Sequence, residues 1–264
     1  MEVGVAPKTP RSTTLTVTGS ERLTPHLVRV HFGGPGFDEF EPGPYTDSYV
    51  KLELEAGGGT VLRTYTVRAV NPRSRQIAID FVVHGDHGVA GPWAASVRPG
   101  QTVVVRGPGG AYRPDPEADW HLLAGDDTAI PAVAAALEAL APDAVGRVFL
   151  EVTDAADAID LAAPPGVEVT WLHRGSGAGA VGPDLSGANA PLVAAVTGAE
   201  WLPGDPHVFI HGEAETVMHH LRPYIRKTRG VPAARASISG YWRRGRSEEG
   251  FREWKRELAT VEAR

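Results

Sequence analysis

The segment Arg63–Arg68 (RTYTVR) combines residue types that suit a flavin. In an extended strand Arg63 and Tyr65 point to one face of the sheet, and Thr66 points to the other. A cation beside an aromatic ring offers a partner for a pyrophosphate and a flat apolar surface for an isoalloxazine. The Thr66 hydroxyl and backbone N–H can reach the N5/O4 edge of that ring. The alternative is an ordinary exposed strand face, because Arg, Tyr and Thr are all tolerated in sheets.

The segment Asp80–Ala94 (DFVVHGDHGVAGPWA) reads as a buried strand, a glycine-rich turn and the start of a helix. Successive N–H groups in such a turn, with a helix N-terminus behind them, attract an anion. Gly85 and Gly88 allow the backbone to approach a pyrophosphate closely. His84 and His87 suggest a metal pair as an alternative, but no carboxylate–histidine partner pattern accompanies them.

The segment Leu122–Pro131 (LLAGDDTAIP) reads as a strand, a turn and an Ala-rich helix. Ligands commonly sit beyond the carboxyl ends of parallel strands in this context. The segment lacks the GxGxxG pattern of dinucleotide sites. Two adjacent acids also repel a phosphate, and a simple helix cap by Asp127 or Thr128 is the alternative.

Two further segments combine arginine with aromatic residues. In Trp171–Gly175 (WLHRG), His173 and Arg174 can meet an adenosine ribose phosphate, because Arg forks onto phosphate oxygens. The alternative is a solvated pair in a loop. The segment Ile238–Arg246 (ISGYWRRGR) predicts a lid over a flat cofactor and an anionic substrate, with a basic surface turn as the alternative.

The elements that must position these residues change in kind along the chain. Short β-rich runs separated by Gly/Pro/Asn/Asp clusters predict a small barrel or sandwich in the first part. These runs are 13–18, 27–32, 48–54, 61–70, 76–84 and 102–106. Strands alternating with helices then predict an α/β domain with a mostly parallel sheet. The strands are 120–124, 145–152, 167–173 and 208–211, and the helices are 130–140, 192–199, 213–229 and, in the tail, 247–263.

This change of texture predicts two domains, 1–117 and 118–264. The net charge of -6 argues against a nucleic-acid partner. No apolar run approaches the ~20 residues of a membrane span, so a cytoplasmic location is expected. The chain has no cysteine, so any redox chemistry needs an organic cofactor. No heptads or long apolar face demand a partner, and a monomer is expected.

Taken together, the motifs resemble the siderophore-interacting proteins, a branch of the ferredoxin–NADP reductase-like flavoenzymes. RTYTVR, DFVVHGDHGVAGPWA, AGDDTAIPAV, WLHRG, HGEAE and GYWRRG match that family in order and spacing over nearly the whole chain. The resemblance implies an FAD-binding antiparallel barrel followed by an α/β domain that binds NADPH or NADH. It also implies that FAD carries electrons from the nicotinamide to a ferric siderophore, which releases Fe(II).

The resemblance implies binding roles for most of the singled-out residues and assigns a certain catalytic role to none. Cofactor contacts are expected at Arg63, Thr64, Tyr65, Thr66, Val67, Asp80, His84, Gly88, Val89, Ala90, Trp93, Gly125, Asp126, Asp127, Thr128, His173, Arg174, Gly212, Glu213, Tyr241 and Trp242. Contacts to the iron chelate are expected at Lys51, Arg243 and Arg246. No metal is expected as a resident ligand.

The chain departs from the family pattern at two positions. Gly91, followed by Pro92, stands where many relatives carry Ser or Thr, so a phosphate there must rely on backbone N–H groups. Asp127 stands where Glu is commoner, which leaves the choice of nicotinamide open. Ferredoxin is an alternative donor in this family. Other readings are a reductase with another acceptor, a siderophore-binding module without catalysis and, more remotely, an α/β transferase.

Overall fold

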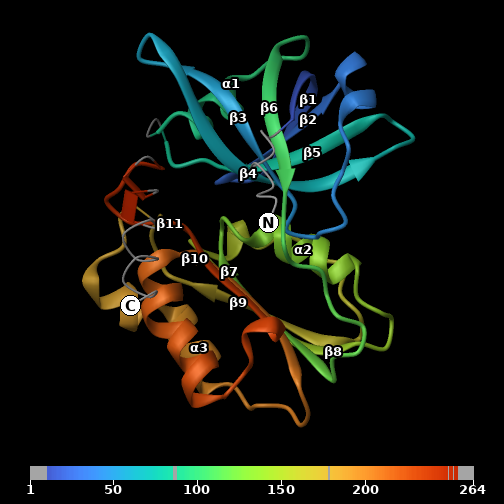
Figure 1. Ribbon diagram of the computed structural model, residues 1–264. Coiled ribbons are helices and arrows are strands. Elements are labelled where there is room, and N and C mark those ends of the chain that lie inside the picture. Colours follow the sequence, from blue (N-terminus) through green and yellow to red (C-terminus); the bar gives the residue numbers. More distant parts are fainter. Residues whose placement is uncertain (1–10, 86–87, 178, 249, 252, 255–264) are drawn as a thin grey trace, which may run out of the picture.

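The computed structural model describes residues 11–85, 88–177, 179–248, 250, 251, 253 and 254. This part of the chain forms a β-barrel and an α/β unit that lie one above the other (Figure 1). The last barrel strand ends at Gly109 and the first strand of the second sheet begins at Trp120. The expected boundary near residue 117 falls between them, and the domain limits stay a prediction.

The barrel consists of six antiparallel strands in the closed order β1-β2-β5-β4-β3-β6. Their bounds are β1 Ser12–Thr24, β2 Leu27–Gly33, β3 Tyr49–Ala56, β4 Gly59–Asn71, β5 Gln76–Val82 and β6 Thr102–Gly109. Alternate residues face the interior, where Leu15, Val30 and Leu52 are fully buried. A short helix, α1 (Ala90–Ser96), packs against the barrel. The barrel predicted from the period-2 pattern is confirmed.

The second unit is built on five parallel strands in the order β11-β10-β7-β8-β9. Their bounds are β7 Trp120–Asp126, β8 Val145–Val152, β9 Gly166–His173, β10 Pro206–Glu213 and β11 Ala236–Trp242. The chain moves to one side of β7 for β8 and β9, and then to the other side for β10 and β11. Ligands in such sheets bind beyond the carboxyl ends of the strands, at the point where the order reverses.

Helices cover both faces of the sheet. On one face α2 (Ile130–Glu138) packs its Ile130 and Val133 against Leu123 and Val148. This helix also contacts β4, so it lies between the sheet and the barrel (Figure 1). On the other face α3 (Pro191–Gly198) and the segment Glu215–Leu221 bury an apolar cluster with β7 and β10. None of the helices in the described residues is long and apolar enough to cross a membrane.

Three parts of the expected secondary structure are wrong or incomplete. The segment 236–242 is a strand, β11, whereas the sequence indicated a lid or a surface turn for most of it. The expected helix 213–229 is present as one helical run over 214–228, but most of it is π-helical, in the segments Glu215–Leu221 and Tyr224–Thr228. Pro223, between them, has no N–H to donate to a regular helix. Of the expected tail helix 247–263, residues 248, 250, 251, 253 and 254 are helical, residue 247 is not, and the others lie outside the described residues.

Candidate functional site

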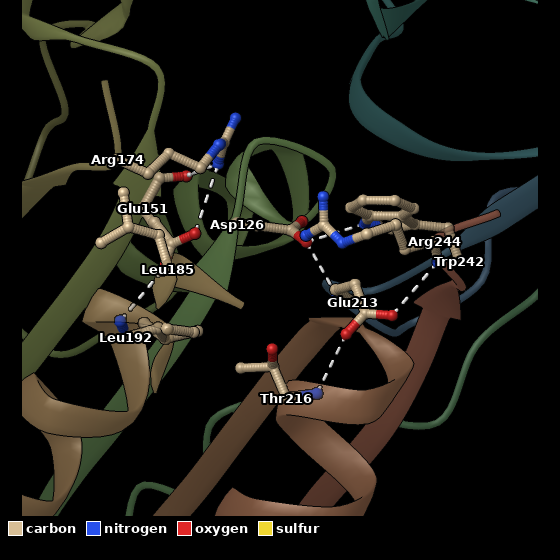
Figure 2. A pocket seen from close by; sticks show the side chains of 10 residues that line it. Asp126, Glu151, Arg174, Leu185, Leu192, Glu213, Thr216, Trp242 and Arg244 are labelled. Atoms are coloured by element: carbon tan, nitrogen blue, oxygen red, sulfur yellow. Dashed lines mark hydrogen bonds and ion pairs between the residues drawn. The ribbon is translucent and has the colours of Figure 1, made fainter. Parts of the chain in front are cut away.

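The carboxyl ends of β7, β8 and β10 carry three acidic side chains that line one pocket. They are Asp126, Glu151 and Glu213, and the pocket is also lined by Arg174, Trp242 and Arg244. Figure 2 shows that the Trp242 indole and the Arg244 side chain lie beside Asp126 and Glu213. The pocket sits where the strand order reverses, because β7 and β10 are the two neighbouring strands at that point.

Asp126 joins three elements at this pocket. Its Oδ1 accepts from the Thr128 N–H at 3.0 Å and from the Thr128 hydroxyl at 2.6 Å. Its Oδ2 accepts from the Glu213 N–H at 2.8 Å and from the Trp242 indole N–H at 2.7 Å. All four donors belong to the chain itself. Asp126 therefore fixes the turn after β7 against the ends of β10 and β11.

Glycine is required next to Asp126 on its own strand, β7, and on the neighbouring strand β10. A Cβ on Gly125 would lie 2.4 Å from the Ala129 Cβ and 2.5 Å from the His211 carbonyl oxygen. Gly212 has a φ of 151°, and a Cβ there would lie 2.8 Å from Asp126 Oδ2. These positions lack space for any side chain, which explains the two glycines of AGDD and HGEAE.

Asp127 points to the other side of the turn and pairs with Arg174. The Arg174 guanidinium binds Asp127, donates to the Glu151 carbonyl oxygen at 3.2 Å and lies 3.5 Å from Glu151 Oε1. Burial raises the pKa of the Asp127 carboxyl to about 7, against the opposing effect of Arg174. Burial also raises the pKa of Glu151. Arg174 thus neutralises a buried acidic pair, while His173 is exposed at the end of β9.

The remaining pocket carboxylates cap backbone groups. Glu151 accepts from the Leu192 N–H at 2.9 Å, at the start of α3. Glu213 accepts from the Thr216 N–H at 3.0 Å and from the Arg244 N–H at 3.2 Å. Buried carboxylates with such partners are satisfied and orient the elements that they bind. Sequence reasoning missed Glu151, whose only hint was an acid near the end of a strand.

Strand β4 brings the predicted flavin residues to the surface between the two units. Tyr65 is half-buried and its ring centroid lies 4.4 Å from that of Phe81 in the barrel core. Burial raises the pKa of Tyr65 above its usual value. Thr66, on the opposite face, is buried, and burial raises the pKa of Tyr241 in β11 against the opposing effect of Thr66. Strand β4 meets the α/β unit at α2, where Arg68 donates to Glu138 Oε2 at 3.0 Å.

Arg63 lies at the start of this run, and the C-terminal segment reaches it. Its guanidinium donates to the Leu62 carbonyl oxygen at 2.9 Å and lies 3.9 Å from Glu248 Oε2. The Thr64 hydroxyl donates to Glu248 Oε1 at 3.0 Å. The Arg63 side chain is 18% exposed. The cation predicted for a pyrophosphate is thus next to a carboxylate of the chain.

The glycine-rich turn leaves the barrel beside this strand. Gly85 and Gly88 have φ values of 57° and 80°, and a Cβ at either would meet nothing within 4 Å, so the backbone there is open. A Cβ on Gly91 would lie 3.1 Å from the Val82 carbonyl oxygen, so the missing hydroxyl reflects close packing of α1 on β5. His87 lies outside the described residues, and a metal pair with His84 stays untested. Among the described residues no group of three metal-binding side chains occurs.

Several residues expected in this turn pack into the barrel instead of facing an open site. Asp80 is fully buried and forms two hydrogen bonds with Arg29, at 2.6 and 2.8 Å. The Trp93 ring lies 5.5 Å from Phe81, and Ala90 is buried. Val67 is also in the barrel core, and Val89 packs against it. These side chains support the turn, and contacts to a cofactor from them stay a prediction.

The basic residues expected to face a chelate lie near the C-terminal segment. Lys51 in β3 pairs across the ladder with Thr64, whose hydroxyl binds Glu248. The Arg243 guanidinium lies 4.6 Å from the Trp254 ring centroid, and its Nη1 is buried without a hydrogen-bond partner in the described part of the chain. Arg246 is exposed. The structure therefore brings the Lys51 region and the Arg243 segment to the same side of the molecule.

A closed antiparallel barrel followed by a parallel five-stranded sheet defines the ferredoxin reductase-like class of two-domain proteins. The ferredoxin NADP+ reductase of Neisseria gonorrhoeae, solved with bound FAD and NADP, has this fold: it superposes with a TM-score of 0.61 at 12% identity, covering 88% of this chain and 99% of that chain. The model of the siderophore-interacting protein family matches residues 118–245, and that of the siderophore-interacting FAD-binding domain matches residues 53–112. The chain belongs to the siderophore-interacting protein family.

Individual relatives agree with this membership. An uncharacterized protein of Mycobacterium tuberculosis is 55% identical over 270 residues, covering 94% of this chain and 95% of that protein. The ferric vibriobactin reductase ViuB of Vibrio cholerae is 38% identical over 202 residues, covering 73% of this chain and 68% of that protein. A siderophore utilization protein from T. fusca has a solved structure with a TM-score of 0.78 and 36% identity, covering 90% of this chain and 94% of that chain.

Proposed function

We propose that this chain uses FAD and a nicotinamide dinucleotide to reduce ferric iron held by a siderophore. The observation that carries the proposal is the contact between β4 and α2, in which Arg68 donates to Glu138 Oε2 at 3.0 Å. This contact supports the proposal because it holds the predicted flavin strand of the barrel beside the α/β unit, whose strand ends form the candidate nicotinamide pocket. The kinship with a ferric vibriobactin reductase supports the choice of a ferric siderophore as acceptor.

The residues of the barrel fit FAD in charge and shape. Arg63 supplies a cation for the diphosphate, because guanidinium groups bind phosphate oxygens in pairs. The open backbone at Gly85 and Gly88 can approach the same phosphates. The Tyr65 ring, which packs against Phe81, offers a flat apolar surface for the isoalloxazine. When bound, FAD accepts two electrons from a nicotinamide and passes them on singly to iron.

On the donor side the nicotinamide dinucleotide would bind beyond the carboxyl ends of the strands, next to the strand-end pocket. Asp126 and its four donors keep the turn after β7 rigid, and Trp242 forms one wall. Since Arg174 is already bound to Asp127 and Glu151, a ribose 2′-phosphate needs a second cation. The proposal includes both NADH and NADPH as donors.

On the acceptor side three cations attract the chelate. Ferric complexes of hydroxamates, catecholates and carboxylates are often anionic, so Lys51, Arg243 and Arg246 lower the energy of the encounter. Arg243 contributes a buried nitrogen that has no hydrogen-bond partner among the described residues, which an oxygen of the chelate would satisfy. No acid or base of the protein is needed for electron transfer to iron.

The test is an anaerobic reduction assay on the FAD-reconstituted protein. NADH or NADPH should bleach the flavin absorption, and a ferric siderophore should restore it while an Fe(II) chelator develops colour. Ferredoxin as donor, and quinone, ferredoxin and free flavin as acceptors, form the comparison arms. Protein that takes up no FAD, or reduced protein that a ferric siderophore does not reoxidise, contradicts the proposal.

A pair of variants tests the assignment of Arg63. Arg63→Ala should weaken FAD binding by about tenfold or more, because a hydrogen bond to a charged group contributes about 1.5–3 kcal/mol. Arg73→Ala, which removes an exposed arginine from the far end of the barrel, is the matched control. Equal dissociation constants for FAD in the two variants would reject the diphosphate role.

A further inference from the structure

A buried carboxylate of the α/β unit is held entirely by the barrel. Asp157 ends a short 3-10 turn, Ala155–Asp157, that follows β8. Its Oδ1 accepts from the Thr24 hydroxyl at 2.9 Å and from the His26 N–H at 3.2 Å, and its Oδ2 lies 2.8 Å from His26 Nδ1. Thr24 ends β1, and His26 lies in the turn that leads to β2. This group of three residues is called the latch below.

The latch carboxylate is better protected from water than the carboxylates of the other ion pairs that join the two units in the described residues, although His26 itself is 37% exposed. The side chain of Asp157 is 4% exposed, compared with 21% for Glu248 and 48% for Glu138, which pair with Arg63 and Arg68 of the barrel. Exposed ion pairs contribute little to orientation, because water screens them. Hydrogen bonds to a buried charge are stronger and more directional. Asp157 is therefore the most buried carboxylate among the ion pairs that join the two units in the described residues.

On the barrel side the latch is connected to the glycine-rich turn. The His26 carbonyl oxygen accepts from the Val83 N–H at 2.8 Å, and Leu27 pairs with Val82 in the β2–β5 ladder. Val83 directly precedes His84, where the turn begins. The charges that act on His84 include Arg174, His26 and Asp157. The glycine-rich turn therefore begins next to the latch, one residue after Val83, which is bonded to His26.

On the other side the latch is connected to the strand-end pocket. The Val152 carbonyl oxygen, at the end of β8, accepts from the Arg174 N–H at 3.1 Å, and the Thr153 carbonyl oxygen accepts from the Gly175 N–H at 2.9 Å. Four residues after Thr153 the chain reaches Asp157. The same short segment therefore carries the pocket residue Glu151 and the latch residue Asp157.

We infer that Asp157 is a positioning residue: through Thr24 and His26 it fixes the glycine-rich turn of the barrel against the strand-end pocket of the α/β unit. In the proposed function, on which this part of the inference rests, the latch sets the separation between the flavin and the nicotinamide. Transfer between two bound groups depends steeply on their separation, and a displacement of about 1 Å can reduce a rate about a hundredfold.

Distances between the two units test the fixing role without any cofactor. The chain has no cysteine, so Glu55→Cys in the barrel and Asp143→Cys in the α/β unit give two unique spin-label sites, both exposed. Asp157→Ala should broaden or shift the distance distribution measured by pulsed electron spin resonance. Asp154→Ala is the matched control, since Asp154 is exposed and its side chain accepts from the Ala156 N–H in the same turn. An unchanged distribution in Asp157→Ala overturns the inference.

A second measurement tests the effect on the proposed transfer. With FAD bound, Asp157→Ala should slow single-turnover flavin reduction by about ten- to a hundredfold while the dissociation constant of FAD stays within about twofold. Asp157→Asn should restore much of the rate, because its amide oxygen still accepts from Thr24 and the His26 N–H. A rate equal to that of the wild type overturns the cofactor-spacing role. If Asp157→Ala does not fold, Thr24→Val combined with His26→Ala removes two of the three bonds and replaces it in both measurements.

These outcomes separate the inference from the proposed function. The spin-label distances are measured on the protein without cofactor, so they stand even if the chain reduces no siderophore. A wild-type protein that binds FAD but is not reduced by nicotinamides contradicts the proposed donor and leaves the latch to be judged by the distances alone.

Discussion

Asp127, which follows β7, and Arg174, which follows β9, form an ion pair that links the ends of these two strands. Only 9% of the Asp127 side chain and 2% of the Arg174 side chain are exposed. Both residues were expected to meet a nicotinamide dinucleotide. Removing one member of a buried pair leaves an unpaired charge and costs about 3–5 kcal/mol. We therefore expect Arg174→Ala to lower the free energy of unfolding, measured by urea denaturation. The loss should lie at the lower end of this range, about 3 kcal/mol, because Asp127 can take up a proton and lose its charge.

Arg147 provides the control for this variant. It also lies on the sheet and pairs with two acids, Glu168 and Glu200, but these are 67% and 79% exposed. Arg147→Ala should therefore cost less than about 1 kcal/mol. Similar losses for the two variants would contradict the structural role assigned to Arg174.

The close approach at Gly125 makes a sharp prediction about packing. Gly125→Ala places a methyl group within 2.5 Å of the His211 carbonyl oxygen, which is backbone and cannot swing away. Overpacking of this kind costs about 1–3 kcal/mol, so the midpoint of thermal unfolding should fall. Gly198→Ala is the control, since a Cβ there meets nothing within 4 Å. Equal midpoints for the two variants would show that the turn after β7 can rearrange to accept the methyl group.

Two histidines that pair across neighbouring strands, His121 in β7 and His207 in β10, predict a dependence of stability on pH. Burial lowers the pKa of His121 to about 4, and His207 adds to the effect. Its Nδ1 is buried without a hydrogen-bond partner in the described part of the chain. Because the unfolded chain binds this proton near the ordinary value of about 6.5, the folded state loses stability as the pH falls from there towards 4.

For His121 the expected loss between about pH 7.5 and about pH 5 is on the order of 2 kcal/mol. The measurement is the free energy of unfolding in urea at both pH values. His121→Leu should remove most of this difference, whereas His173→Leu, at an exposed position, should leave it in place. A difference of the same size in His121→Leu would assign the effect to other groups.

The contact between Glu248 and Arg63 predicts competition with a bound phosphate. Glu248 lies 3.9 Å from the cation that we assign to the FAD diphosphate. Glu248→Gln removes a competing charge and should tighten FAD binding by about two- to fivefold, as measured by fluorescence titration. Glu253→Gln, an exposed change in the same segment, is the control and should have no effect. Weaker binding in Glu248→Gln would indicate that Glu248 helps to hold the cofactor.

Local patterns were sufficient to predict most of the fold. Alternation of apolar residues identifies all six barrel strands, because one face of each strand must be buried. The texture change after residue 113 marks the start of the α/β unit, and strands β7–β10 are apolar runs of ordinary length. Strand β11 was missed because Gly240 and the following aromatic and arginine residues are typical of a turn. Only the pairing with β10 makes this run a strand.

The candidate site was only partly predictable, because several of its contacts join distant parts of the chain. The types and spacing of Arg63 and Tyr65 indicated a flavin strand without any structural information. Nothing near Arg174 in the sequence reveals that Asp127, 47 residues earlier, neutralises it. The contact between Asp157 and His26 spans 131 residues and has no local signature. The composition of the chain does not reveal which charged residues pair with a distant residue in the fold and which face a ligand or solvent.

The sheet order also bears on synthesis of the chain. Strand β6 closes the barrel by pairing with both β1 and β3, so the first unit can complete its hydrogen bonds once Gly109 has left the ribosome. The second unit has to wait for its final strand, because β11 covers the edge of β10 and comes last in the chain. Until Trp242 emerges, the nascent protein carries a finished barrel attached to an open sheet edge, and such edges attract other chains.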